Sequence, residues 1–227
     1  SVGGSSSFLW YPDTHHLIDS TRDSMQILDI DTGDRVYISD EYAPAQQQWN
    51  SDYSLFAVPD PIDFSLSIID YPSADIIQNI PLSVFYFNTH WVNYDQIIVL
   101  RVQNLTNTTF ADYDIVSGKK DLVGYDVASG EEAYRIVDAG TYQISHDRTQ
   151  IMILTKDNQL EHIDAATGQT LWTSEVVDEG WTSIIWSPDD SKIILSSFYV
   201  GQAKIFDVET GEELKVFPYS DLSWSPD

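Results

Sequence analysis

The chain has 227 residues, of which 42% are hydrophobic and 13% aromatic, enough to bury the core of one sizeable all-β domain or of two small ones. Its 36 Asp and Glu outnumber 11 Lys and Arg, for a formal net charge of −25, which excludes nucleic acid and anionic lipid as favoured partners. The absence of cysteine excludes disulfides and thiolate metal sites, and no apolar run reaches the length of a membrane span. We therefore expect protein partners with basic surfaces.

The start of the chain and one internal segment bear on location. Residues 1–7, SVGGSSS, have the composition of a flexible linker and do not begin with Met, so we expect a processed chain or part of a longer polypeptide with further domains. Asn104 and Asn107 begin two adjacent N-x-T sequons, which are candidate glycosylation sites, although such sequons also arise by chance. Together these features favour an extracellular, cell-surface or periplasmic location.

A corner motif of the type W-S-P-D recurs along the chain, first in "LWYPD" and last in "SWSPD". The spacings between successive copies are 39, 42, 53, 42 and 38 residues. One bulky residue per period is what packing between repeated units requires, and we prefer that role to ligand stacking. The anchor positions are Trp10, Trp49, Trp91, Ile144, Trp186 and Trp224.

A second motif repeats in phase with the first: an apolar pair, Asp, and then Ser or Thr followed by Gly, as in "IFDVETGE". Glycine supplies positive φ in a tight turn, and Asp can hydrogen-bond its own backbone, so we expect a hairpin at each copy. A degenerate copy, "IIDYPSAD", has Asp70 in the same position. The full copies contain Asp29 and Gly33, Asp126 and Gly130, Asp164 and Gly168, and Asp207 and Gly211.

The segments between these motifs are short and β-rich, such as "QIMILT" and "KIILSS", and none has an apolar stripe of helical period. Four strands in about 40 residues predict the blade of a β-propeller. The predicted fold is all-β, with five full four-stranded repeats and the first strand of a sixth. Residues 1–7 are linker-like, the blades span 8–44, 45–84, 85–139, 140–180 and 181–221, and residues 222–227 begin a further blade.

The third period is longer by about a dozen residues, and the excess lies in "NLTNTTFADYDIVSGKKD", which contains both sequons. We interpret it as a surface loop, either a binding loop or an insertion without a role. A chain with six first strands for five full blades leaves two interpretations open. It is either part of a longer protein or a closed five-bladed ring with one strand left over.

These motifs resemble known propeller repeats. "IIWSPDDSKIILSSFYVGQAKIFDVETGEEL" is similar to the repeats of WD40-like propellers and to the TolB-type "WSPD" repeat, whereas "HIDAATGQTLWTSEV" resembles the quinoprotein-type repeat, in which Trp172 serves packing. The chain departs from eukaryotic WD40 repeats because it lacks their Gly-His and has FD, LD, YD or ID in place of WD. The resemblance implies a propeller fold and protein binding, and it implies no particular ligand.

No catalytic motif is present: the sequence lacks a nucleophile elbow, a phosphate-binding loop, a dinucleotide fingerprint and a zinc-binding HExxH. His15 and His16 are adjacent, so on a strand they point to opposite faces and are poorly placed to chelate one ion. For the acidic loop Asp29–Asp34 we prefer a hairpin to a calcium site, because it lacks the distal Glu of an EF-hand. We assign no catalytic, cofactor-binding or metal-binding residue, with calcium as a weak alternative.

We therefore predict a non-catalytic β-propeller that acts as a protein-interaction or structural module of an exported or cell-surface assembly. Two alternatives remain. One is the propeller domain of a larger enzyme, either a quinoprotein or the gating domain of a serine peptidase. The other is a structural propeller of a halophile, whose acidic surface keeps it hydrated in high salt.

Overall fold

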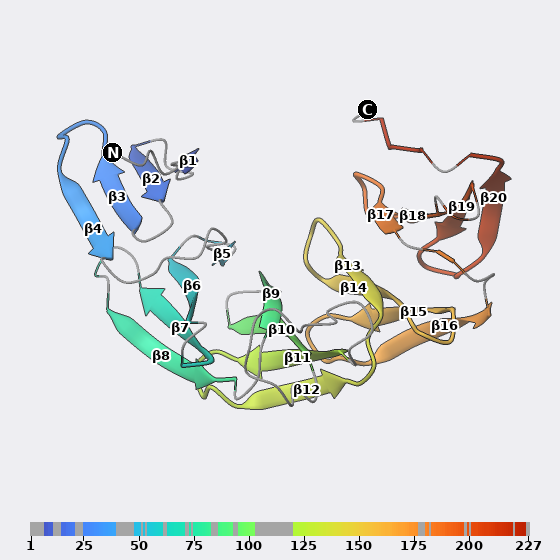
Figure 1. Cartoon of the computed structure of the whole chain (residues 1–227), viewed down its shortest axis with the longest axis horizontal. Coiled ribbons are helices and arrows are strands. Elements are labelled where there is room, and N and C mark those ends of the chain that lie inside the picture. Colours follow the sequence, from blue (N-terminus) through green and yellow to red (C-terminus); the bar gives the residue numbers. More distant parts are fainter. Residues whose placement is uncertain are drawn as a thin grey trace. The chain divides into compact units, whose positions relative to one another are not determined.

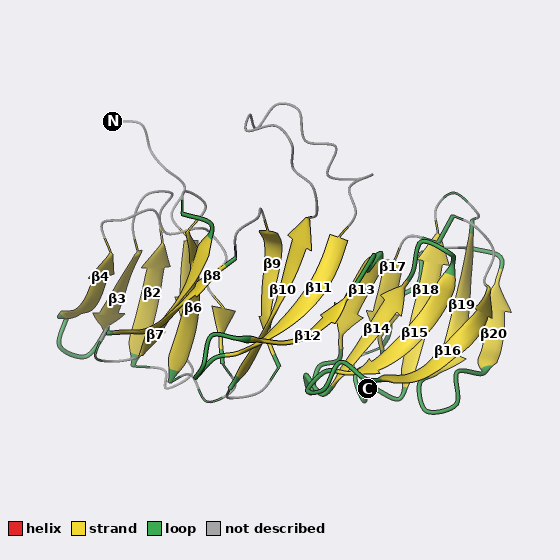
Figure 2. Cartoon of the chain, turned by 90° about the horizontal axis from the view of Figure 1, so that it is seen from below, coloured by secondary structure: helices red, strands yellow, loops and turns green. Residues whose placement is uncertain are grey.

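The computed structural model describes residues 7–10, 15–20, 25–39, 48–50, 52, 54–60, 63–70, 73, 75–82, 86–92, 95–102, 120–176, 180–181, 183–197, 199, 201–219 and 221–225. The chain divides into two compact units, residues 1–97 with 126–131 and residues 98–125 with 132–227, and each is considered by itself. All regular elements in these described ranges are β-strands (Figure 2). The search of the described residues for a helix able to span a bilayer finds none.

The first unit holds two complete antiparallel sheets, whose strands are labelled in Figure 1. The first sheet contains β1 (Ser7–Trp10), β2 (His16–Ser20), β3 (Met25–Asp29) and β4 (Arg35–Ser39). The second sheet contains β5 (Gln48–Trp49), β6 (Leu55–Asp60), β7 (Ser65–Asp70) and β8 (Ile76–Pro81).

The third sheet has the order β12-β11-β10-β9, and the division between the two units falls within its sequence. Its strands are β9 (Tyr86–Trp91), β10 (Gln96–Val102), β11 (Lys120–Asp126) and β12 (Glu132–Ile136). Between β10 and β11, residues 103–119 lie outside the described part of the chain. Both predicted sequons, at Asn104 and Asn107, and nearly all of the predicted surface loop fall in that segment.

The second unit holds two further complete sheets. The fourth sheet contains β13 (Thr141–Ile144), β14 (Gln150–Leu154), β15 (Gln159–Asp164) and β16 (Thr170–Val176). The fifth sheet contains β17 (Ser183–Trp186), β18 (Lys192–Ser197), β19 (Gln202–Asp207) and β20 (Glu213–Phe217).

Every sheet follows the same plan: four consecutive strands, each antiparallel to the next, with neighbours in chain order. Such meanders form readily because each strand pairs with the one that precedes it, across a short connection. The prediction of an all-β fold built from four-stranded sheets is confirmed.

Burial follows the position of a strand in its sheet. The second strand β18 is buried along almost its whole length, whereas the fourth strand β20 is exposed at four of its five residues. A strand that packs on both faces needs consecutive apolar residues, which Ile193, Ile194 and Leu195 supply, and the small Ser196 and Ser197 are buried after them. In the second unit the main cluster joins the fourth and fifth sheets, and its buried members are Met152, Leu154, Leu160, Trp181, Ile184, Trp186, Ile193, Leu195, Phe206 and Val208.

Residues 221–225 differ from the predicted strand, because no strand is assigned to them. A strand is defined by ladder hydrogen bonds, and none of the five described four-stranded sheets includes this segment. Trp224 nevertheless lies against the fifth sheet, since its indole N–H donates to the carbonyl of Ile185 over 3.1 Å.

Candidate functional site

Four hairpins between third and fourth strands share one hydrogen-bond pattern, and we call them the Asp–Gly hairpins (residues 29–34, 126–131, 164–169 and 207–212). In the last copy the Asp207 carboxylate accepts from the backbone N–H and the hydroxyl of Thr210, both over 2.9 Å. The Thr210 hydroxyl then accepts from the N–H of Glu212 over 3.3 Å. Gly211, at φ +73°, closes the turn by donating to the carbonyl of Asp207. The carboxylate is thus occupied by its own turn.

The other copies repeat these contacts with small changes. Asp126 accepts from Ser129 and Asp164 from Thr167, through both the backbone N–H and the hydroxyl. In the first copy Asp29 accepts from the backbone of Asp31 and Thr32. The degenerate position keeps part of the pattern, because the hydroxyl of Ser73 donates to Asp70 over 2.7 Å.

Hydrogen bonding lowers the pKa of several of these carboxyl groups, because it stabilises the charged form. The backbone N–H of Thr32 is the main cause for Asp29, the side chain of Ser129 for Asp126, and the backbone N–H of Thr210 for Asp207. In the acidic loop Asp29–Asp34, the Asp29 carboxylate therefore accepts hydrogen bonds from the backbone of its own turn. Within the described residues no group of three or more His, Asp or Glu side chains is arranged to hold a metal ion.

The connections between first and second strands form a second repeated turn, which we call the Ser–Asp corners (residues 50–55, 145–150 and 187–192). In the corner at 187–192 the hydroxyls of Ser187 and Ser191 both donate to Asp189, over 2.7 and 2.9 Å. These hydroxyls lower the pKa of Asp189 to about 2. Ser187 in turn accepts from the backbone N–H of Lys192 over 2.9 Å, which pins the start of β18.

A side chain from each of three fourth strands docks on the hairpin glycine of the next sheet. The Trp172 indole N–H donates to the carbonyl of Val208 over 2.7 Å, and its ring lies about 3.1 Å from where a Cβ on Gly211 would be. The Tyr134 hydroxyl donates to the carbonyl of Ala165 over 2.6 Å, and its ring leaves no room for a Cβ on Gly168.

The third member of this set lies in the first unit. There the side-chain amide of Gln78 donates to the carbonyl of Ala128 over 3.4 Å and lies against Gly130. In this position Gln, Tyr and Trp perform the same task, which is to donate to the next sheet while covering its turn. These hairpin positions therefore need glycine for two reasons: the backbone has positive φ, and the docking side chain leaves little room for a Cβ.

The predicted anchor tryptophans lie where first strands pack. Trp49 and Trp91 are buried, and Trp49 contacts the ring of Phe56 with 4.8 Å between centroids. The buried Trp186 donates its indole N–H to the carbonyl of Gln143 over 3.2 Å, which repeats the Trp224 contact one sheet earlier. The side chain of Trp10 lies outside the described residues.

One further contact joins two successive Ser–Asp corners. The Asp190 carboxylate accepts from the backbone N–H groups of His146 and Asp147, each over 3.0 Å, and lies 2.7 Å from the His146 ring nitrogen Nδ1. Asp190 adopts φ +56°, a conformation that Asp tolerates better than most residues. Its side chain is only 10% exposed, so this contact fixes the two corners against each other.

The histidines are dispersed. His15 lies 2.6 Å from the Asp31 carboxylate, whereas His16 belongs to β2 and is paired in register with Asp29. His162 is buried between Gln150, which it contacts over 2.7 Å, and the ring of Trp172. Burial lowers the pKa of His162 because it disfavours the imidazolium.

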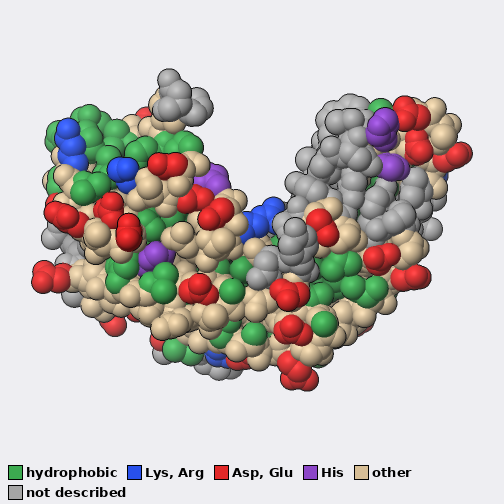
Figure 3. Space-filling model, turned by 180° about the vertical axis from the view of Figure 1, so that it is seen from behind, with side chains coloured by type: hydrophobic (Ala, Val, Ile, Leu, Met, Phe, Trp, Pro, Cys, Tyr) green, Lys and Arg blue, Asp and Glu red, His purple; other side chains and the backbone are tan. Residues whose placement is uncertain are grey.

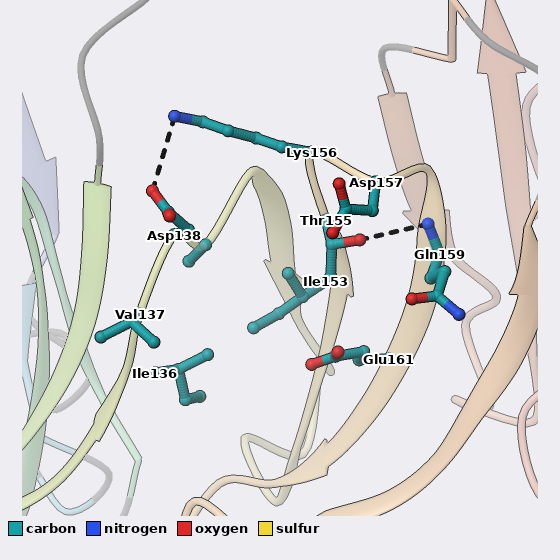
Figure 4. Close-up of a pocket in the computed structure, with 10 residues that line it drawn as sticks. Ile136, Val137, Asp138, Ile153, Thr155, Lys156, Asp157, Gln159 and Glu161 are labelled. Atoms are coloured by element: carbon teal, nitrogen blue, oxygen red, sulfur yellow. Dashed lines mark hydrogen bonds and ion pairs between the residues drawn. The ribbon is translucent and has the colours of Figure 1, made fainter.

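A Ser–Asp corner and an Asp–Gly hairpin of the same sheet lie at the same end of that sheet. Backbone hydrogen bonds join them there: in the fifth sheet Val208 donates to the carbonyl of Ser191. In the second unit we call this the corner end. The opposite end, where the β14–β15 turn lies, we call the pocket end. The pocket end contains a cavity of about 330 Å³, which lies between the last residue of β12 with the residues that follow it and the strands β14 and β15 with their turn (Figure 4).

The cavity combines an apolar wall with charged groups. Ile153 and Glu161 are direct partners in the β14–β15 ladder, so their side chains lie on the same face and point toward the cavity. The opposite wall contains Ile136 and Val137, and Val137 is 65% exposed. At the mouth, the Lys156 ammonium lies 3.6 Å from the Asp138 carboxylate (Figure 4).

The connection that forms this wall is held in place by a buried carboxylate. Asp121 is 1% exposed and accepts from the Arg135 guanidinium over 3.0 Å and from the backbone N–H of Asp138 over 3.3 Å. Arg135 also pairs with Glu132, which is the main reason that its pKa is raised. This guanidinium is therefore committed to its own unit.

Sequence reasoning missed both the docking series and the cavity. Gln78 differs in type from Tyr134 and Trp172, so only their shared place as the third residue of a fourth strand could have revealed the series. The cavity draws its lining from positions that do not repeat between blades, and the motifs that we used cannot detect such positions.

No protein-family model matches this sequence, and no curated protein matches it either. Solved structures match its fold, among them the C-terminal WD40 domain of Sif2, with a TM-score of 0.61 and 12% sequence identity. That match covers 95% of this chain and 58% of the other, and at this identity it shows the fold alone. The four-stranded antiparallel sheets and this match together give the chain the fold of a WD40-like β-propeller.

Proposed function

We propose that the chain is a non-catalytic propeller module that binds other proteins, and that its partners present basic surfaces. The observation that carries this proposal is the excess of 36 Asp and Glu over 11 Lys and Arg on a WD40-like scaffold. Acidic side chains are spread over the face drawn in Figure 3. A field of this sign speeds the encounter with basic partners and disfavours acidic ones.

The scaffold is suited to recognition because its turns are held in one conformation. The Ser–Asp corners and Asp–Gly hairpins satisfy their own backbone groups, and side chains such as Trp172 and Asp190 bind each turn to a neighbouring sheet. A surface that is ordered before binding loses little conformational entropy when a partner docks.

The location and the finer type of propeller are part of the same proposal. We propose an exported or cell-surface assembly, supported by the sequons at Asn104 and Asn107 and by the linker-like start. The contact of Trp172 with Gly211 supports the quinoprotein-type resemblance of its repeat, and the Ser187–Asp189 corner supports the TolB-type resemblance. The intact mass of the natively purified protein tests the location, because glycans add mass in hexose-sized steps.

The interaction itself is tested with an array of basic peptides, each paired with a scrambled peptide of identical composition and therefore identical charge. At about 0.15 M salt, where the screening length is about 8 Å, a recognition module retains particular sequences and rejects their scrambled partners. Retention that follows net charge alone would contradict the proposal.

The same acid excess favours a second candidate function, that of a structural propeller adapted to high salt. A halophilic protein needs salt to offset the repulsion among its carboxylates, so its melting temperature falls steeply when salt is withdrawn. Thermal unfolding at low and at molar salt separates the two candidates, since a recognition module keeps its fold at about 0.1 M salt.

A further inference from the structure

We propose that the cavity at the pocket end of the second unit receives the side chain of an arginine from a basic partner. This inference rests on the proposed function and names the place and the chemistry of one contact. The cavity has about 330 Å³, the lower end of the range of about 300 to 1,000 Å³ that is typical of binding pockets.

The first reason for proposing an arginine is the charge of the cavity. The carboxylates of Asp138, Asp157 and Glu161 line the cavity against one cation, Lys156. Within the described part of the chain, neither Asp157 nor Glu161 has a side-chain hydrogen bond or ion pair, in contrast to the repeated Asp residues at the corner end. The cavity therefore has two negative charges in excess and two carboxylates ready to accept from a cation.

Shape and polarity favour a long side chain over a bare metal ion. Ile153 beside Glu161 and, on the opposite wall, Ile136 and Val137 give the cavity apolar sides, which suit the methylene stem of arginine below its charged end. The planar guanidinium offers five donors and is more weakly hydrated than an ammonium, so it enters a partly apolar site at lower cost. Val137, which is 65% exposed, would pack against the backbone of the arriving segment.

The present ion pair at the mouth does not oppose entry strongly. Lys156 and Asp138 are 3.6 Å apart and their side chains are 44% and 40% exposed. Exposed pairs of this kind contribute little to stability, and a guanidinium with two accepting carboxylates outcompetes such a pair. Lys156 thus acts as a competitor of the incoming arginine, and its removal should strengthen binding.

The test uses N-acetyl-L-arginine methylamide as the probe and the citrulline analogue, which has the same shape without the charge, as its control. Both are titrated into the isotope-labelled full chain at about 0.15 M salt, and backbone amide shifts are followed by NMR. We expect saturable shifts around residues 136–139, 153–157 and 161 with the arginine probe alone. Equal shifts with citrulline, or arginine shifts spread over the acidic surface, would overturn the proposal.

Two matched variants separate the cavity from general electrostatics. Glu161→Gln should weaken probe binding by about tenfold, the usual effect of losing one charge-assisted hydrogen bond. Glu209→Gln removes the same charge from an exposed hairpin position in the same unit and should leave binding unchanged. Equal weakening in both variants would show that only the net charge matters.

The variant Lys156→Met tests the competition directly. It keeps the length of the side chain and removes its charge, so we expect the arginine probe to bind severalfold more tightly. Unchanged or weaker binding would contradict the role of Lys156 as a competitor.

The peptide array distinguishes failure of this inference from failure of the proposed function. If Glu161→Gln retains the same arginine-containing peptides as the native chain, the partner binds elsewhere, and the cavity inference fails while the function stands. If no sequence is selected by the native chain, the proposed function itself fails.

Discussion

The corner end and the pocket end of the second unit are both acidic, but their carboxylates have different surroundings. At the corner end Asp164, Asp189 and Asp207 each accept hydrogen bonds from a hydroxyl and a backbone N–H of their own turn. At the pocket end Glu161 faces a cavity without such a donor among the described residues. The repeated acids of the corner end thus hold their own turns, whereas Glu161 has no such structural contact among the described residues.

The largest effect is expected where a repeated turn meets the preceding sheet. Gly168→Ala places a Cβ against the ring of Tyr134 and strains a backbone at φ +69°. Positive φ costs about 1 to 2 kcal/mol and overpacking about 1 to 3, so we expect a loss of about 2 to 5 kcal/mol in the free energy of unfolding, measured with urea.

Gly201→Ala is the matched control, because Gly201 has φ +66° but nothing within 4 Å of the new Cβ. It should lose about 1 to 2 kcal/mol, from the backbone alone. Equal losses in the two variants would show that the Tyr134 contact adds nothing to the stability of the hairpin.

The second prediction compares one acid from each end. Asp190→Asn keeps the residue's tolerance of positive φ but weakens the three contacts to His146 and Asp147, and we expect a loss of about 1 to 2 kcal/mol. Glu161→Gln, which has no such contacts, should stay within about 0.5 kcal/mol of the native chain. Urea unfolding of both variants at neutral pH measures the difference, and a larger loss in Glu161→Gln would reverse the comparison.

This contrast also explains what the sequence could predict. Asp, Ser or Thr and Gly at fixed spacing specify a hairpin locally, so the positions of Asp207 and Gly211 indicated a turn without knowledge of the fold. The docking of Tyr134 on Gly168 was beyond reach, because Gln and Trp fill the same position elsewhere and only the three-dimensional arrangement shows their common task.

The cavity could not be predicted for a different reason. Ile136, Ile153 and Glu161 belong to two sheets, and their closeness depends on how those sheets pack rather than on any local motif. The sequence analysis identified "QIMILT", which contains Ile153, as a β-rich segment, but a strand prediction cannot reveal that the packing leaves a gap beside it. Long-range packing of this kind is the part of a site that sequence patterns do not contain.

A smaller effect is expected from the buried imidazole of His162. Its pKa in the folded protein lies below the ordinary value of 6.5, so the unfolded chain takes up the proton first as the pH falls. Its contribution to stability is therefore complete above pH 6.5 and decreases below it, until the folded pKa is passed. His162→Gln should make the free energy of unfolding, measured with urea, depend less on pH just below 6.5. If the pH dependence stays unchanged, it arises from groups other than His162.

The smallest effect is expected at the corner end, and it occurs at the lowest pH. Asp189 has a pKa of about 2, against an ordinary 3.8, because the hydroxyls of Ser187 and Ser191 stabilise its charged form. Since the folded pKa is the lower one, the stabilisation is present above pH 3.8 and is lost as the pH falls toward 2. Asp189→Asn should therefore be less sensitive to acid between these values than the native chain, as measured by thermal unfolding at each pH. Hydrogen bonds also lower the pKa of Asp29, Asp126 and Asp207 in the Asp–Gly hairpins, so one substitution should remove only part of the acid sensitivity. Complete removal by Asp189→Asn would contradict a contribution from those hairpins.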